Sequence, residues 1–260
     1  MKLKFKKIIF CGEKILSVKC LDYLRKNYKV KIVGICTRKV SRVWWGKQVL
    51  REYAKKNKIK IMKTTDIKQN QADLLISVLF PLKIKKKIID KFEQAINLHQ
   101  APLPEFKGCN GASHAIIDNV KFFGSTLHLL SSKLDEGDIV AEKKFSLKKN
   151  ITAKELYEYN DDIAFELFKK NIGKVLKNEM KLKKQSIGKY KTNQRNSLNN
   201  KEINLKMSKN KIWNKVRGNE FYPFEPCYIK IGKEKKIYLL SKPWKYSEKP
   251  KSFEPWKFND

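Results

Sequence analysis

The feature that most constrains the fold is the alternation of short apolar runs with an amphipathic segment at the start of the chain. The pattern predicts a buried strand at Lys7 to Gly12, a helix with one apolar side at Glu13 to Asn27, and a second strand at Val30 to Thr37. Two strands separated by a helix favour parallel pairing, because a parallel pair needs a crossover connection. We therefore predict an α/β protein with a Rossmann-like, mostly parallel open sheet.

Further strands are predicted along the chain. Ile59 to Met62 is short, whereas Asp73 to Phe80 is continuously apolar and is therefore expected in the middle of the sheet. A long helix is predicted from Thr152, as its cap, to about Asn178. The turn at Gly12 lacks the glycine pattern of dinucleotide-binding folds, which argues against a nicotinamide cofactor.

A candidate site follows from the stretch Ala95 to Gly111, which begins as an apolar strand and then breaks at two prolines. Asn97 and His99 are two positions apart, so their side chains leave the same face of this strand near its end. Ligands of open α/β sheets bind at the carboxyl ends of the strands. An acidic loop that contains Asp135 follows later in the chain. An amide, an imidazole and a carboxylate brought together there could carry out a proton-coupled transfer.

These residues also carry a resemblance that covers roughly residues 5–180. The chain resembles the folate-dependent formyltransferases, which use N10-formyltetrahydrofolate and include glycinamide ribonucleotide, methionyl-tRNA and sugar-nucleotide N-formyltransferases. The matching motifs are Asn97-Leu98-His99, Leu103-Pro104, Lys107-Gly108 and Leu134-Asp135 with Gly137-Asp138-Ile139. The resemblance implies the formyltransferase fold, N10-formyltetrahydrofolate as the cosubstrate, and no metal.

The resemblance also implies roles for individual residues. His99 and Asn97 would donate hydrogen bonds to the oxyanion that forms during transfer. Asp135 would accept the proton of the attacking amine through water, or hold His99 protonated. The folate would bind between the turn at 78–82 and the loop at 131–138. The candidate folate-binding residues are Val78, Leu79, Phe80, Leu82 and Asp138.

Within this family, Lys107 to Asn110 followed by His114-Ala115-Ile116 is more similar to the sugar-nucleotide N-formyltransferases of bacterial surface-polysaccharide pathways, such as lipopolysaccharide O-antigen synthesis. The expected substrate is a nucleotide-linked amino-deoxy sugar, such as a dTDP-linked 4-amino-4,6-dideoxyhexose. The acidic Glu105 is a poor neighbour for an RNA phosphate. Two alternatives stay open: a methionyl-tRNA formyltransferase, and a basic nucleic-acid-binding protein in which the Asn/His/Asp set is inert.

The expected domains are a catalytic domain at 1–180, a Lys-, Gln- and Asn-rich linker at 181–200, and a small C-terminal subdomain at 201–260. That subdomain is predicted to hold a helix and a hairpin through which the chain forms a homodimer, and it is short for the β-barrel domain of methionyl-tRNA formyltransferases. Aromatic residues could stack on the nucleotide base and Arg217 could meet phosphate, or these residues could simply pack the tail. The candidate substrate-binding residues are Lys107, Trp213, Arg217 and Tyr222.

The net charge of +33 arises from 59 basic residues, of which only six are Arg. Lysines spread along every segment indicate solvated faces more than a nucleic-acid interface, although an electropositive surface that attracts nucleotide pyrophosphates is the alternative. The apolar runs are shorter than the ~20 residues that span a bilayer, so no membrane insertion is expected. Five scattered cysteines without metal-ligand spacing favour a reducing cytoplasm. His114 is interpreted as a structural residue, and Trp44-Trp45 as a hydrophobic lid or a cover for an anionic ligand. His128 is also interpreted as structural, although the family resemblance implies a histidine near the site at this position.

Overall fold

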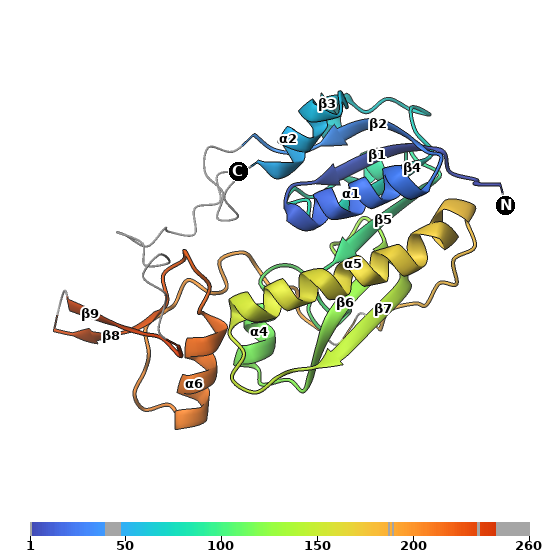
Figure 1. Ribbon diagram of the computed structural model, residues 1–260. Coiled ribbons are helices and arrows are strands. Elements are labelled where there is room, and N and C mark those ends of the chain that lie inside the picture. Colours follow the sequence, from blue (N-terminus) through green and yellow to red (C-terminus); the bar gives the residue numbers. More distant parts are fainter. Residues whose placement is uncertain (1, 40–47, 187, 189, 233–234, 243–260) are drawn as a thin grey trace.

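A seven-stranded sheet in the order β3-β2-β1-β4-β5-β6-β7 forms the centre of the computed structural model, which describes residues 2–39, 48–186, 188, 190–232 and 235–242 (Figure 1). The Trp44-Trp45 loop lies outside the described residues. Strands β1 to β5 run parallel, and β6 and β7 are antiparallel. The strands are β1 (Lys7–Gly12), β2 (Lys31–Cys36), β3 (Ile61–Met62), β4 (Leu74–Val78), β5 (Gln94–His99), β6 (Phe122–Leu129) and β7 (Ile139–Ser146).

The strand order creates a switch point in the middle of the sheet. β1 pairs with β2 on one side and with β4 on the other, so the chain first moves outward to β3 and then returns across the sheet. Such a reversal leaves a crevice at the carboxyl ends of the strands on either side of it. β5 lies next to β4 and ends at the same edge, so the predicted site residues are carried to this part of the molecule.

Alternating side chains of β1 divide the core into two layers. Ile8 and Phe10 pack under the helices of one face, whereas Ile9 and Cys11 belong to a separate apolar cluster on the other face. This period of two lets one strand serve both layers. The first face is covered by α1 (Ile15–Asn27), α2 (Val49–Lys56) and α5 (Ala153–Lys177) (Figure 1). The cluster on the second face includes Ile88 of α3 (Lys86–Ile89) and Ile67, which follows the 3₁₀ helix η1 (Thr64–Asp66).

Helix α5 begins and ends where the sequence predicts. The Glu155 amide donates to the Thr152 hydroxyl at 3.3 Å, and the Glu155 carboxylate accepts from the Thr152 amide at 2.9 Å. This reciprocal pair is a capping box. At the other end Asn178 adopts a left-handed conformation (φ 62°) and terminates the helix.

Asparagine occupies five of the eight non-glycine positions with a positive φ in the described part of the chain. Asn110, which precedes α4 (Gly111–Ile117), has a φ of 59°, and its side chain makes no capping hydrogen bond to the helix. Its Nδ2 donates instead to the Arg195 carbonyl at 3.1 Å. The other left-handed asparagines are Asn70, Asn119, Asn150 and Asn178.

The C-terminal part adds the predicted helix and hairpin. α6 (Lys209–Gly218) packs against α4, and β8 (Cys227–Ile231) pairs with β9 (Lys235–Leu239) in a separate two-stranded sheet (Figure 1). The stretch predicted as a linker makes more contacts than its polar composition suggests. Lys183 exchanges two main-chain hydrogen bonds with Ile139, at 2.8 and 2.9 Å. Among the described helices, none is long and apolar enough to cross a bilayer.

Candidate active site

Strand β5 delivers Asn97 and His99 to the carboxyl edge of the sheet, and antiparallel β6 places His128 directly opposite Asn97. The Asn97 Nδ2 lies 3.1 Å from the His128 Nε2. The His99 and His128 rings are edge to face, with centroids 6.3 Å apart. The strand-end pair predicted from the sequence is therefore accompanied by a second histidine, which the spacing of the motif alone did not identify.

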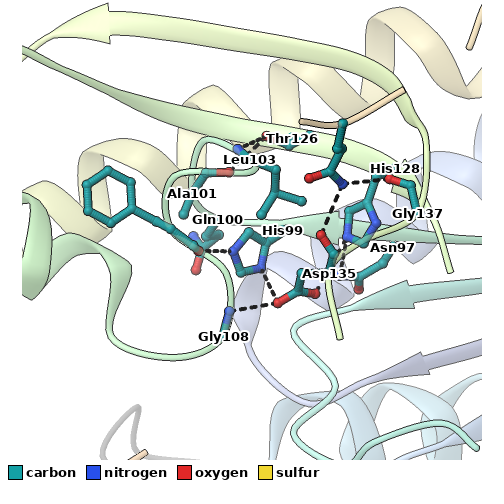
Figure 2. A network of polar contacts seen from close by, with 12 residues as sticks. Asn97, His99, Gln100, Ala101, Leu103, Gly108, Thr126, His128, Asp135 and Gly137 are labelled. Carbon is teal, nitrogen blue, oxygen red and sulfur yellow. Dashed lines mark hydrogen bonds and ion pairs between the residues drawn. The ribbon is translucent and has the colours of Figure 1, made fainter. Parts of the chain in front are cut away.

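Asp135 closes this group from the loop between β6 and β7 (Figure 2). Its Oδ2 is 3.8 Å from the His99 Nδ1, and its Oδ1 is 3.7 Å from the His128 Nε2. The Gly108 amide donates to Oδ2 at 2.9 Å. Asp135 itself is buried and has a left-handed backbone (φ 55°), a conformation that costs of order 1–3 kcal/mol unless its surroundings hold it.

The hydrogen bonds define which ring nitrogens carry protons. The His128 Nδ1 donates to the Leu129 carbonyl at 2.8 Å, so in the neutral ring Nε2 is bare and accepts from Asn97. Burial, assisted by the neighbouring His99, lowers the pKa of His128 to about 4 although Asp135 opposes the shift. The His99 Nε2 donates to the Phe106 carbonyl at 2.8 Å, which leaves Nδ1 directed toward Asp135.

The residues predicted to bind folate differ in how exposed they are and in whether their main-chain groups are already hydrogen-bonded. The Val78 side chain is fully buried, and the Val78 carbonyl accepts a hydrogen bond from the Ser17 hydroxyl at 2.6 Å. Val78 is therefore not exposed to a ligand. Leu79 has a left-handed backbone (φ 52°), and Leu82 is 42% exposed. The Asp138 carbonyl belongs to the sheet, where it accepts from the Leu129 amide at 2.9 Å. Leu79 and Phe80 are half-buried, as is Asp138, so Val78 is the one predicted folate-binding residue whose side chain is not exposed at all.

The residues predicted on the substrate side are largely engaged within the protein. Lys107, only 3% exposed, forms an ion pair with Glu136 at 2.8 Å. Arg217, 7% exposed, donates to the Ile151 carbonyl at 2.9 Å and to the Asn214 side chain at 2.6 Å.

The two aromatic residues predicted on the substrate side, Trp213 and Tyr222, belong to the C-terminal part of the chain. The Trp213 indole donates to Asn150 at 3.2 Å, and the Lys154 ammonium lies 5.3 Å from the centre of the Tyr222 ring. For Lys107, Arg217, Trp213 and Tyr222 these contacts favour structural roles over contact with substrate.

A second polar cluster adjoins the site, and no sequence motif points to it. The Lys14 ammonium is 3.3 Å from the Tyr157 hydroxyl, and the Gln100 amide donates to Asp161 on α5. Burial lowers the pKa of Lys14 to about 8 and raises the pKa of Asp161 to about 6. Nearby, Arg38 pairs with Glu13 through two hydrogen bonds of 2.9 and 3.0 Å.

Asn160, beside Asp161, connects α5 to the strand ends. It is 1% exposed, and its amide donates to the carbonyls of Gln100 and Gly124, both at 3.0 Å. Its side-chain oxygen accepts from the Ser125 hydroxyl at 2.9 Å. The residue after His99 is thus held to α5 by a buried group whose hydrogen bonds are satisfied. Across the described residues, no three His, Cys, Asp or Glu side chains are grouped so as to hold a metal ion.

Comparison with known proteins gives the family. A model of the formyl transferase family matches residues 8–172, and the chain belongs to this family. It is 27% identical to the methionyl-tRNA formyltransferase of Clostridium acetobutylicum over 232 residues, which cover 84% of this chain and 74% of that protein.

Two solved structures are also similar. The N-formyltransferase from Helicobacter canadensis, in complex with folinic acid and dTDP-3-aminofucose, is 27% identical with a TM-score of 0.72, covering 87% of this chain and 84% of that one. WlaRD, a sugar 3N-formyl transferase in the presence of dTDP and 5-N-formyl-THF, is 28% identical with a TM-score of 0.73, covering 85% and 82%. The predicted α/β formyltransferase fold is thereby confirmed.

The neutral, buried state of His128 predicts a dependence of stability on pH. Between a folded pKa of about 4 and an unfolded pKa of about 6.5, the unfolded chain binds a proton that the folded protein excludes. The free energy of unfolding should therefore fall as the pH drops through this range, by up to about 3 kcal/mol from His128 alone. Denaturant unfolding of the wild type and of His128→Gln at several pH values measures the difference.

The raised pKa of Asp161 changes the stability with pH in the opposite direction, but it does so in both proteins, so its contribution cancels in the comparison. Parallel pH curves for the two proteins would show that His128 is not buried as the neutral ring.

Proposed function

We propose that this protein transfers the formyl group of N10-formyltetrahydrofolate to the amino group of a nucleotide-linked amino-deoxy sugar. The observation that carries the proposal is the convergence of Asn97, His99 and Asp135 at the carboxyl edge of the sheet, in a chain that belongs to the formyl transferase family. The similar structures that contain folate derivatives together with dTDP or a dTDP-sugar support both the donor and the acceptor.

The reaction joins the acceptor nitrogen to the formyl carbon and breaks the bond between that carbon and N10 of the folate. In net terms a proton moves from the acceptor amine to N10. The His99 Nε2 is bonded to the Phe106 carbonyl, so a proton that the ring donates toward substrate would be carried on Nδ1, at the Asp135 side. That N–H, with the second N–H of the Asn97 amide, would stabilise the oxyanion on the formyl oxygen.

The proton of the attacking amine needs an acceptor in the same place. Asp135 can take it through a bridging water and return it to N10 as the carbon–nitrogen bond breaks. His128 contributes as a neutral acceptor for Asn97, because its bare Nε2 fixes the orientation of the amide whose other N–H is directed at substrate. These are the roles that the proposal assigns to the four polar residues.

The amino position of the sugar is the finer part of the proposal. The sequence resemblance suggested a 4-amino-4,6-dideoxyhexose, whereas the two similar structures concern 3-amino sugars. A methionyl-tRNA acceptor is the second candidate, supported by the Clostridium acetobutylicum relative. Glu105, the residue that argues against RNA, is paired with Lys144 at 3.1 Å. A homodimer formed through the hairpin also remains a prediction, and the exposed Ile231 and Ile237 are the candidate contacts between the subunits. A cytoplasmic role in surface-polysaccharide synthesis is a further prediction.

A direct assay separates these acceptors. The purified protein is mixed with N10-formyltetrahydrofolate and, in parallel reactions, with a dTDP-linked 3-amino sugar, a dTDP-linked 4-amino sugar or methionyl-tRNA. We expect formylation of an amino sugar, detected as the mass of one added formyl group, with a kcat/KM of at least about 10⁴ M⁻¹s⁻¹. Free dTDP should inhibit competitively against the sugar. Formylation of methionyl-tRNA with no reaction on either sugar would establish the second candidate instead.

A further inference from the structure

The described stretches 183–186 and 190–197, here called the strap, lie along both loops that position the Asp135 carboxylate. The strap begins with the main-chain pairing of Lys183 with Ile139, at the start of β7. Because the two segments run antiparallel, Gln185 lies beside the loop that precedes β7. The strap is therefore attached next to the turn that carries Asp135.

Gln185 holds the main chain of this turn. Its Nε2 donates to the Asp135 carbonyl at 3.0 Å and to the Gly137 carbonyl at 2.6 Å. On the opposite side the turn is pressed against β6, since a Cβ atom added to Gly137 would lie 1.8 Å from the Leu129 carbonyl oxygen. The left-handed conformation of Asp135 is thus fixed from both sides, by β6 and by one glutamine side chain.

The other end of the strap holds the partner of the Asp135 carboxylate. The Asn193 amide donates to the Lys107 carbonyl, and the Asn193 carbonyl accepts from the Cys109 amide, both at 2.9 Å. These bonds bracket Gly108, whose amide donates to the Asp135 Oδ2 (Figure 2). The buried pair of Lys107 with Glu136 joins the two loops directly. Loop, strap and loop form a closed set of contacts around one carboxylate.

We infer that Gln185 is a positioning residue for formyl transfer, acting through the main chain of Asp135. The inference rests on the proposed role of Asp135 in that reaction. Gln185 lies too far along the chain from the motifs to be identified with them, and its neighbours Lys184 and Ser186 are exposed. Its side chain is half-buried because it reaches into the loop.

The test replaces Gln185 in the full-length chain with methionine, which keeps the length of the side chain and removes its N–H donors. Gln194→Met is the matched control, because Gln194 is an exposed glutamine of the same strap. Amide hydrogen exchange of the free protein is measured first. Gln185→Met should accelerate exchange at residues 133–138 and leave β1, β4 and β5 unchanged, whereas Gln194→Met should alter neither. Unchanged exchange in the loop would overturn the inference, whatever the acceptor of the enzyme is.

Kinetics then separate positioning from folding. With N10-formyltetrahydrofolate and the amino sugar that the wild type formylates, Gln185→Met should lower kcat by about 10- to 100-fold with little change in the KM for the folate. In an Asp135→Asn background the same substitution should cause no further loss, because the group that it positions is already absent. An equal loss in both backgrounds, or a rise in KM at constant kcat, would overturn the positioning role. Failure of the wild type to formylate any amino sugar would refute the proposed acceptor alone, since the exchange measurement does not depend on it.

Discussion

Replacement of His99 by asparagine should lower kcat by about 10²- to 10³-fold, the loss typical of removing one oxyanion donor or a general acid–base group. His99 is the residue whose ring spans the site, with Nε2 bonded to the Phe106 carbonyl and Nδ1 directed to Asp135. Asparagine is small enough to fit the strand end, but its amide cannot become a cation opposite Asp135. The expected loss is therefore in the transition state, with the KM for the folate nearly unchanged.

Steady-state kinetics of His99→Asn, with melting temperature as the check on folding, measure this effect. His114→Asn is the matched control, because it makes the same chemical change at a histidine that contacts Ser197 on the strap at 2.8 Å and is not near Asp135 in any described contact. The control should keep wild-type turnover within about threefold. If His99→Asn turned over at the wild-type rate, the reaction would have to use a different group, and the mechanism proposed for His99 and Asp135 would be wrong.

The second large effect is expected from Gly108→Ala. Gly108 has a φ of 87°, and an added Cβ would lie 2.3 Å from the Asn193 carbonyl oxygen, a main-chain atom of the strap. Since that atom is fixed by the bond to Cys109, either the strap or the 107–109 loop must move. We expect a loss of unfolding free energy of about 3 kcal/mol or more, from the left-handed backbone and from the displaced contacts together. A fall in kcat should accompany it, because the Gly108 amide is a hydrogen-bond donor to the Asp135 carboxylate.

Gly232→Ala provides the control for the backbone term. Gly232 also has a positive φ, of 65°, but no described atom would lie within 4 Å of its added Cβ. It should therefore lose about 1 kcal/mol, the cost of the left-handed conformation alone, and keep full activity. Denaturant unfolding and turnover are measured for both variants. Equal destabilisation of the two would mean that the strap does not press against Gly108.

The fold was predictable to the extent that it depends on local periodicity. The β–α–β start, the central position of β4 and the limits of α5 follow from apolar spacing and capping residues, and the structure agrees with each. Apolar spacing over residues 84–92 also indicates a helix, but the structure forms only α3, Lys86–Ile89. The apolar residues Ile84 and Ile88 pack on the second face of the sheet, but Phe92 belongs to the turn that leads into β5. A short connection between two parallel strands limits the helix more than its composition does.

The site was predictable only where its residues share one strand. Asn97 and His99 follow from their spacing, whereas the acidic loop only suggested Asp135 as a third member and the family resemblance supported it, because the loop between β6 and β7 is distant in sequence. His128 was interpreted as structural because the antiparallel register that sets it opposite Asn97 cannot be obtained from either strand alone. Register depends on both partners and on the turn between them.

Polar composition was the least reliable guide. Residues 181–200 resemble a linker because their partners are main-chain groups of the two loops, which impose no apolar pattern on the sequence. Arg217 suggested a phosphate ligand because it is one of few arginines, yet it is buried against Ile151 and Asn214. Charge alone does not show whether a side chain faces solvent or satisfies buried carbonyl groups.

The left-handed asparagines relate the composition of the chain to the entropy of folding. The sequence has only 11 glycines in 260 residues, and asparagine occupies five of the described positive-φ positions. Asparagine tolerates this conformation because its short amide can bond locally, and unlike glycine it restricts the backbone when the chain is unfolded. A turn with asparagine therefore loses less conformational entropy on folding than the same turn with glycine would lose. A chain biased toward lysine and asparagine thus forms its sharp turns with a residue that it has in abundance.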